Sequence, residues 1–132
     1  MRQVRAGKVP LVGGGTARFS FTHAHDAATA IVAALDRTTD GVLNIVDDDP
    51  APVNDWLPAL ADILVVRRPR TAPAVLARLA VGDWGVAFMT RLRGADNARA
   101  RRILDWRPSR PSWRQGFVAE LRGESDPAIR PQ

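Results

Sequence analysis

The spacing of apolar residues changes near the start of the chain. Phe19 and Phe21 alternate with polar residues, and this short period predicts a half-buried strand. From Asp26 onward, apolar residues recur at helical spacing as far as Arg37. Asp26 stands where an N-cap carboxylate would accept the free amides of the first turn. The pattern therefore predicts a strand that runs into a capped helix.

The glycine run Gly13–Gly15 lies between this strand and the apolar segment Val9–Val12. A dinucleotide-binding loop needs a strand before the glycines, a helix after them and a further spaced glycine. Here a strand follows and the spaced glycine is missing, so the run predicts a hairpin turn between two strands. Farther along, Val42–Val46 is apolar on both faces, which predicts a strand inside a sheet. Its polar member, Asn44, is interpreted as a structural amide bonded to neighbouring backbone.

Helical spacing dominates the remainder of the chain. Four further helices are predicted, over 54–64, 73–91, 97–104 and 112–121. The third has Asn97 at a capping position, and the longest is predicted to bury Leu76, Leu79 and Trp84. Residues 1–122 are assigned to one structural portion, followed by a polar tail over 123–132.

Composition limits the size and location of the protein. The chain of 132 residues is 45% hydrophobic and 25% charged, which is enough for one domain with a modest core. Arg78 and Asp83 interrupt the longest apolar stretch, 72–89, so no run can span a bilayer. The chain has no cysteine, which excludes disulfides and thiolate metal sites and agrees with a reducing compartment. We therefore expect a cytoplasmic protein with no membrane partner.

The net charge raises the possibility of an acidic partner. It is formally +5, and every basic side chain except Lys8 is an arginine. One interpretation is a small basic binding module for nucleic acid or an acidic partner, with Arg99, Arg101 and Arg102 as its contacts. The alternative is codon bias, since the arginines are spread along a chain that is also rich in alanine. We favour the alternative, because no aromatic platform accompanies the arginines.

Two short motifs contain residue types that bind metals. His23 and His25 share a face of the predicted strand and could ligate a metal with a carboxylate, but no third ligand is fixed nearby. Asp47, Asp48 and Asp49 are consecutive, whereas a metal loop spaces its ligands and turns on a glycine. The sequence therefore predicts no metal site, and a solvated turn at the three acids.

Four segments resemble, in order and spacing, motifs of the extended short-chain dehydrogenases, the NAD(P)-dependent epimerases and dehydratases. The junction over 21–28 is similar to a segment that commonly reads HVDDVA, and GVLNI over 41–45 is similar to GVYNI. The segment NARARRILDWRP over 97–108 resembles NxKAxxxLGWxP, and SWRQGF over 112–117 resembles the start of the closing helix. Each motif alone is weak, but four in the family's order make a specific match.

The resemblance implies a fold, and it implies which functions belong to each half of that fold. It covers the family's C-terminal half, so we expect an α/β chain that forms the substrate-binding part of a partial Rossmann-type extended short-chain dehydrogenase. Such a part is mostly helical, with a hairpin and one or two short sheet strands. The family's N-terminal half supplies the glycine-rich dinucleotide loop and a Tyr-x-x-x-Lys pair whose tyrosine is the acid/base.

This chain lacks that catalytic equipment. It has no tyrosine and no dinucleotide loop. We therefore expect no catalytic and no cofactor-binding residue on it, and no activity of the chain alone. A separate or missing N-terminal half would bind NAD or NADP.

The resemblance also implies a sugar-like small-molecule substrate of the nucleotide-sugar type. The phosphate-contacting arginine of the epimerases would fall on Phe19 here, with Arg18 one residue earlier. We take Arg18, Trp84, Arg91 and Arg93 as candidate substrate residues, because guanidinium forks and an indole face suit a phosphorylated or polar-ring ligand. The alternative is solvated arginines and a core tryptophan. Structural roles are assigned to His23, Asp26, Asn44, Asn97 and Trp106.

Two predicted helix ends lack the glycine that the family pattern places there. Asp105 replaces a glycine that would close a helix in the left-handed region, which aspartate tolerates less well. Val65 and Val66 stand where another helix-ending glycine is expected.

Overall fold

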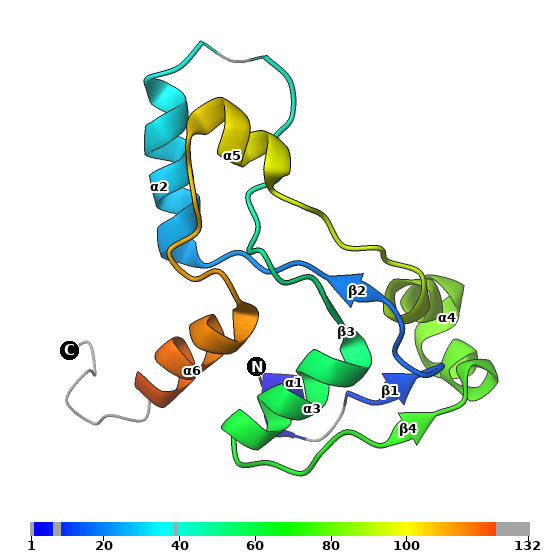
Figure 1. The fold of residues 1–132 in the computed structure, drawn as a ribbon. Coiled ribbons are helices and arrows are strands. Elements are labelled where there is room, and N and C mark those ends of the chain that lie inside the picture. Colours follow the sequence, from blue (N-terminus) through cyan, green and yellow to red (C-terminus); the bar gives the residue numbers. More distant parts are fainter. Residues whose placement is uncertain (1, 7–8, 39, 124–132) are drawn as a thin grey trace.

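The computed structural model describes residues 2–6, 9–38 and 40–123 of the chain. The elements in order are α1 (Arg2–Arg5), β1 (Leu11–Val12), β2 (Arg18–Phe19), α2 (Ala24–Leu35), β3 (Ala51–Pro52), α3 (Val53–Ile63), β4 (Thr71–Ala72), α4 (Ala74–Thr90), α5 (Ala98–Leu104) and α6 (Trp113–Gly123) (Figure 1). The predicted α/β class, mostly helical with a few short strands, is confirmed. All five predicted helices are present within a few residues of their expected ends, whereas α1 was not predicted. Of the predicted polar tail, only Gly123, which ends α6, lies among the described residues.

The predicted hairpin is wrong. Strand β1 pairs in parallel with β4, and β2 pairs antiparallel with β3, so the two strands on either side of the glycine run have different partners. Gly13–Gly15 all have positive φ, at 56°, 83° and 62°, which turns the chain between two separate ribbons. Side-chain packing explains why the two strands have different partners. Val12 packs on α4, whereas Phe19 packs against Val53 and Leu57 of α3.

The predicted interior strand over 42–46 is also wrong. The segment is not part of any ladder among the described residues, and Val42 is 82% exposed. Leu43 and Ile45 pack on the core between α2 and α5, while Asn44 is exposed. One buried face suffices for this short segment, so its continuous apolar run does not indicate a strand covered on both sides.

The junction before α2 differs from the prediction in its cap. The N-cap residue is His23, whose Nδ1 accepts a hydrogen bond from the backbone N–H of His25 at 3.2 Å. The helix therefore begins before Asp26, and the prediction of an Asp26 N-cap is wrong. Asp26 lies in the first turn and is buried instead.

The end of α3 has an unusual backbone. The N–H of Val65 donates to the carbonyl of Asp62, and the N–H of Val66 donates to that of Ala61. This is the Schellman pattern, which places its C′ residue in the left-handed region. Val65 occupies that position with φ 55°, where the family pattern predicts glycine. Asp105 likewise follows α5 with φ 52°.

Helix α4 bends in its middle. Gly82 has φ 70° and ψ 176°, so the element consists of two helical pieces. The prediction that this helix buries Leu76, Leu79 and Trp84 is wrong, because these side chains are 62%, 87% and 78% exposed. Its buried residues are smaller and include Ala77, which packs with Val12.

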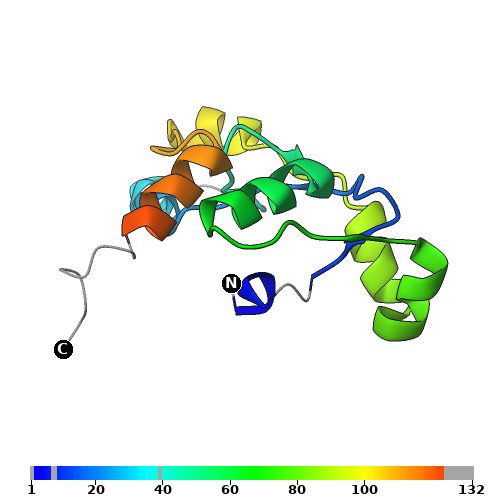
Figure 2. The ribbon, with the colours of Figure 1, turned by 90° about the horizontal axis from the view of Figure 1, so that it is seen from below.

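Within the described residues, three small cores hold the elements together. Helices α2 and α5 lie side by side around Ala30, Leu104 and Trp106, and α3 lies beside α6 (Figure 1). Figure 2 shows α4 at one end of the molecule, away from α2 and α5. Val53 and Leu57 of α3 form the centre of a second core. We call β2 and the extended residues after it, as far as Phe21, the opening strand. It runs between the pair α2 and α5 and the pair α3 and α6, and it can present residues to both pairs.

Candidate functional site

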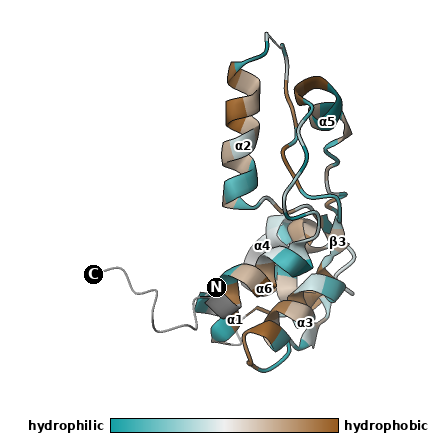
Figure 3. Ribbon diagram, turned by 60° about the vertical axis from the view of Figure 1, so that its left-hand side comes forward, coloured by the Kyte–Doolittle hydropathy of each residue, from teal (hydrophilic) through white to brown (hydrophobic). Residues whose placement is uncertain are grey.

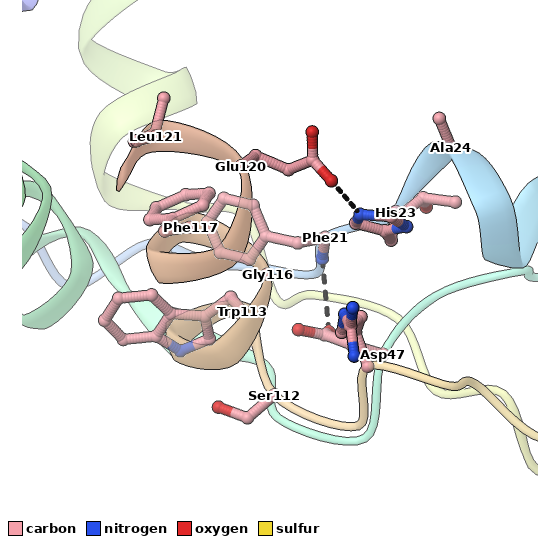
Figure 4. Close-up of a pocket in the computed structure, with 12 residues that line it drawn as sticks. Phe21, His23, Ala24, Asp47, Ser112, Trp113, Gly116, Phe117, Glu120 and Leu121 are labelled. Carbon is pink, nitrogen blue, oxygen red and sulfur yellow. Dashed lines mark hydrogen bonds and ion pairs between the residues drawn. The ribbon is translucent and has the colours of Figure 1, made fainter. Parts of the chain in front are cut away.

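A cavity of about 260 Å³ lies between the end of the opening strand and α6 (Figure 4). Its wall is mainly apolar and includes Phe21, Trp113 and Phe117, with Asp47, His23 and Glu120 as polar members. Sites for drug-sized ligands usually measure about 300–1,000 Å³, so this cavity suits a smaller molecule.

Three rings form the aromatic part of the wall. Phe21 continues the alternating pattern of the opening strand, while Trp113 and Phe117 are four residues apart on α6 and therefore share a helix face. The centroid of Phe21 lies 5.2 Å from that of Phe117 and 6.0 Å from that of Trp113. The rings of Trp113 and Phe117 meet at 64°, an edge-on arrangement that complements the charge distribution of aromatic rings.

Asp47 is the buried acid of the cavity. It is 5% exposed, and its Oδ1 accepts a hydrogen bond from the backbone N–H of Phe21 at 3.2 Å. Burial raises the pKa of Asp47 from 3.8 to about 6. The negative charge of Asp49 acts in the same direction, and the backbone amides of Phe21, Trp113 and Asp49 lower the pKa. The Trp113 amide acts through its proximity, since within the described chain no donor reaches Oδ2 in hydrogen-bonding geometry. The indole Nε1 of Trp113 is likewise buried without a partner there.

A hydrogen bond between His23 and Glu120 lies on the other side of Phe21 from Asp47 (Figure 4). Nε2 of His23 lies 2.8 Å from Oε1 of Glu120. Because Nδ1 of His23 accepts from the His25 amide, the proton of the neutral ring lies on Nε2, which donates to Glu120. His23 thus connects the start of α2 with α6, and both ring nitrogens are engaged.

Asp26 connects α2 to the segment after α5. Its carboxylate accepts from the backbone N–H of Ser109 at 2.7 Å and from that of Arg110 at 3.2 Å. Burial raises the pKa of Asp26, but the hydrogen bonds from Ser109 and Arg110 and the nearby His23 outweigh it, so the pKa lies below its usual value. The carboxylate therefore caps a loop that is distant in sequence.

The other residues assigned structural roles differ in their surroundings. Asn97 is buried, and its Nδ2 donates to the carbonyl of Val46 at 2.8 Å and to Asp48 at 2.7 Å. Trp106 is also buried, and its indole N–H donates to the Thr29 hydroxyl at 3.0 Å. Asn44, in contrast, is exposed.

None of the four candidate substrate residues lines the aromatic cavity. Arg18 and Arg93 lie together through a parallel β-bridge, and a side-chain N–H of Arg18 donates to the Pro50 carbonyl. Arg91 ends α4, and Trp84 stacks on Phe88 at 5.5 Å. The structure thus brings Arg18 and Arg93 together at one edge of the molecule.

Ring contacts connect that edge to the cavity. Phe88 lies 5.0 Å from Phe19, and Phe19 lies 5.5 Å from Trp56. Trp56 in turn lies 5.6 Å from Phe21 in the cavity wall. The alternation of Phe19 and Phe21, the first pattern in the sequence, is therefore the centre of an aromatic row that extends from Trp84 to Trp113.

Sequence reasoning missed Asp47 and the two α6 aromatics as site residues. Asp47 was interpreted as part of a solvated acidic turn, yet it is the first polar residue after an apolar segment, which is a weak signal of burial. Trp113 and Phe117 gave a helical periodicity but no indication of a cavity.

The arginine module receives little support from the contacts. Arg101 pairs with Asp48 at 3.2 Å, and Arg99 donates to the carbonyl of Asp40 at 3.2 Å. Arg101 and Arg102 line a second, polar pocket whose wall also contains Asp96. Acidic groups are thus interspersed with the arginines.

Metal and membrane candidates were also compared with the structure. Among the described residues, no group of three or more His, Cys, Asp or Glu side chains is arranged to hold a metal ion. Within the same part of the chain, no helix has the length and apolar character needed to cross a bilayer.

The glycine run does not fit a dinucleotide. It is followed by β2 rather than by a helix, and Nδ2 of Asn54 donates to the carbonyl of Gly14 at 3.0 Å. A Cβ at Gly15 would lie 2.5 Å from the Leu11 side chain and 3.0 Å from the Asn54 amide nitrogen. Gly15 is thus needed for close packing, and no phosphate cradle forms.

Similar proteins were found by sequence and by structure, although no family model matches. A 3-diazoavenalumate denitrifying reductase from Streptomyces sp. is 46% identical over 118 residues, covering 89% of this chain and 39% of that protein. A functionally unknown conserved protein from Silicibacter pomeroyi DSS has a TM-score of 0.71 at 25% identity, covering 89% of this chain and 42% of its own.

Two further solved structures have names that indicate an enzyme class. The human epimerase family protein SDR39U1 (isoform 2) with NADPH has a TM-score of 0.71 at 20% identity, covering 92% of this chain and 41% of its own. UDP-glucuronic acid 4-epimerase from Bacillus cereus in complex with NAD has a TM-score of 0.60 at 24% identity, covering 92% and 36%. This chain has an epimerase-type fold. The resemblance predicted from the motifs is confirmed at the level of the fold, and the chain spans 39% of the length of its curated relative.

Proposed function

We propose that this chain is the C-terminal, substrate-binding portion of an NAD(P)-dependent epimerase/dehydratase-like protein and that a dinucleotide-binding half must join it for catalysis. The observation that carries the proposal is an uncovered apolar face on α2. Ile31, Val32 and Leu35 are 63%, 62% and 80% exposed, and Figure 3 shows hydrophobic residues along this outer helix. A helix in an α/β fold buries such a face against a sheet, which a dinucleotide-binding half would supply.

The requirements of hydride transfer also indicate that this chain binds the substrate and that another half supplies the cofactor. Hydride transfer requires a cofactor held close to the substrate, and an acid/base group near the reacting carbon. The chain has no tyrosine for that role, and its glycine run packs as a turn. Its own residues would therefore bind and orient a substrate, while the other half would supply the cofactor and the acid/base pair.

For the type of reaction, the curated reductase is a better guide than the two epimerase structures. The name of that relative states a reductase, at 46% identity, whereas the two epimerase structures are 20% and 24% identical. Phe19 also replaces the arginine that a nucleotide-sugar phosphate would require. We therefore favour reduction of a small molecule over epimerisation of a nucleotide sugar. For this substrate, Arg18 and Arg93, which a β-bridge brings together, remain candidate polar contacts, as do Trp84 on α4 and Arg91 at its C-cap.

Reconstitution tests this proposal. The chain would be titrated with NADH and NADPH by calorimetry, first alone and then co-expressed with the part of the 3-diazoavenalumate denitrifying reductase that it does not match. We expect no saturable binding by the chain alone, and a co-eluting complex that binds NADPH.

A matched pair of variants locates the interface. Leu35→Asp places a charge on the α2 face and should abolish the complex. Val42→Asp makes the same type of change at another exposed position, 82% exposed, and should leave the complex intact. Saturable NAD(P) binding by the chain alone, or a normal complex with Leu35→Asp, would contradict the proposal.

A further inference from the structure

The aromatic cavity is a separate site from the α2 face, since none of Ile31, Val32 and Leu35 lines it. Phe21, Trp113 and Phe117 supply apolar ring surface, and the cavity volume of about 260 Å³ leaves space beside them. Planar rings pack well against such a wall through edge-on and offset contacts. The cavity therefore suits a flat apolar ligand of about one ring.

The buried carboxylate of Asp47 adds a polar requirement. Only its Oδ1 has a partner, the Phe21 amide, and among the described residues Oδ2 has none. A buried acceptor left unpaired costs about 1–3 kcal/mol, so a donor that reaches it is favoured. Oδ2 is shielded from solvent, but the terminal torsion of aspartate is broad, which allows the carboxylate to turn toward a donor in the cavity.

The opposite rim is already satisfied. His23 and Glu120 are paired with each other, and the Thr22 hydroxyl donates to the Ile45 carbonyl at 2.6 Å. Among the described residues that line the cavity, the buried polar side-chain atoms without a partner are Oδ2 of Asp47, an acceptor, and Nε1 of Trp113, a donor.

We propose that this cavity binds a single aromatic ring that carries a hydrogen-bond donor, with the ring against Phe21, Trp113 and Phe117 and the donor on Asp47. The inference goes beyond the proposed function, because it concerns a cavity away from the α2 face and is tested on the intact chain without a dinucleotide-binding half.

The test uses phenol as the probe and anisole as its matched partner, which has the ring but no donor. Binding is followed through the indole N–H resonance of Trp113 in the intact chain labelled with ¹⁵N, assigned with a Trp113→Phe variant. Phenol should shift this resonance saturably. Anisole should bind at least about tenfold more weakly, because a hydrogen bond to a charged acceptor contributes about 1.5–3 kcal/mol. Equal affinities for the two probes would overturn the assignment of the donor to Asp47.

Two pairs of variants locate the site. A Cβ at Gly116 would lie 3.9 Å from the His23 ring, so Gly116→Leu extends a side chain into the cavity while improving helix propensity. It should abolish phenol binding, whereas Ala119→Leu on an exposed position of the same helix should preserve it. Asp47→Asn should weaken phenol binding about tenfold. Asp36→Asn, at an exposed acid that does not line the cavity, should not change it. No saturable shift in the unmodified chain, or unchanged binding by Gly116→Leu, would overturn the proposal.

Discussion

The left-handed backbone at Val65 gives a direct test of the energetic reasoning. An L-residue in this region costs about 1–2 kcal/mol because Cβ approaches the following carbonyl oxygen, and β-branching makes Val a particularly poor occupant. Val65 has φ 55° and is 91% exposed, so its side chain gains almost nothing from burial in return. Val65→Gly removes the steric cost and leaves the two Schellman hydrogen bonds in place.

The expected gain is smaller than the steric cost. Glycine loses more backbone freedom on folding, by about 0.5–1 kcal/mol, which offsets part of the relief. We therefore expect Val65→Gly to raise the free energy of unfolding by about 0.5–1 kcal/mol. For a chain of this size the melting temperature should rise by about 2–4 °C.

Thermal and urea unfolding of matched variants measure this effect. Val75 is a second exposed valine, 70% exposed, but it lies in helix α4 with ordinary helical backbone. Val75→Gly should lower stability by about 0.5 kcal/mol, since glycine has the poorer helix propensity. If both variants lower the melting temperature, the left-handed cost at Val65 does not exist in solution.

Two acids should give opposite pH dependences. The pKa of Asp47 is raised to about 6 in the folded chain, so the folded state binds its proton more tightly and stability falls as pH rises from about 4 through 6, by about 3 kcal/mol at most. Urea unfolding across this range should show a flatter profile for Asp47→Asn but not for Asp36→Asn, at an exposed acid outside the cavity; equal slopes would refute the raised pKa. The pKa of Asp26 is lowered, so its contribution is present above the unfolded value of 3.8 and is lost as pH falls through the folded value. Asp26→Asn should cost about 2–3 kcal/mol at neutral pH, because one amide from Ser109 or Arg110 loses its acceptor, and a loss below 0.5 kcal/mol would contradict this role.

Local patterns in the sequence were sufficient to locate most of the helices. Helical periodicity depends on neighbours three and four residues away, so the helix over 54–64 was located from the sequence, and the observed α3 buries Leu57 and Leu60. The motifs also indicated the epimerase-type fold, and the departure at Val65 marked a helix end whose backbone is indeed left-handed.

Strand pairing and capping were beyond these local patterns. The residues flanking Gly13–Gly15 pair with segments far along the chain, at Thr71 and Ala51, and no short-range signal specifies such partners. The cap of α2 changed for a similar reason, since Asp26 binds amides at Ser109 and Arg110, more than eighty positions away.

The candidate site also has some features that the sequence determined and others that only the tertiary structure decided. The sequence by itself determined the alternation of Phe19 and Phe21, and it excluded a tyrosine-based catalytic pair on this chain. Only the tertiary structure decided that α6 closes over Phe21, which buries Asp47 and converts a residue of an apparent surface turn into the acid of an aromatic cavity. The physical reason is that burial and desolvation depend on which distant elements meet, whereas periodicity records only how each element is built.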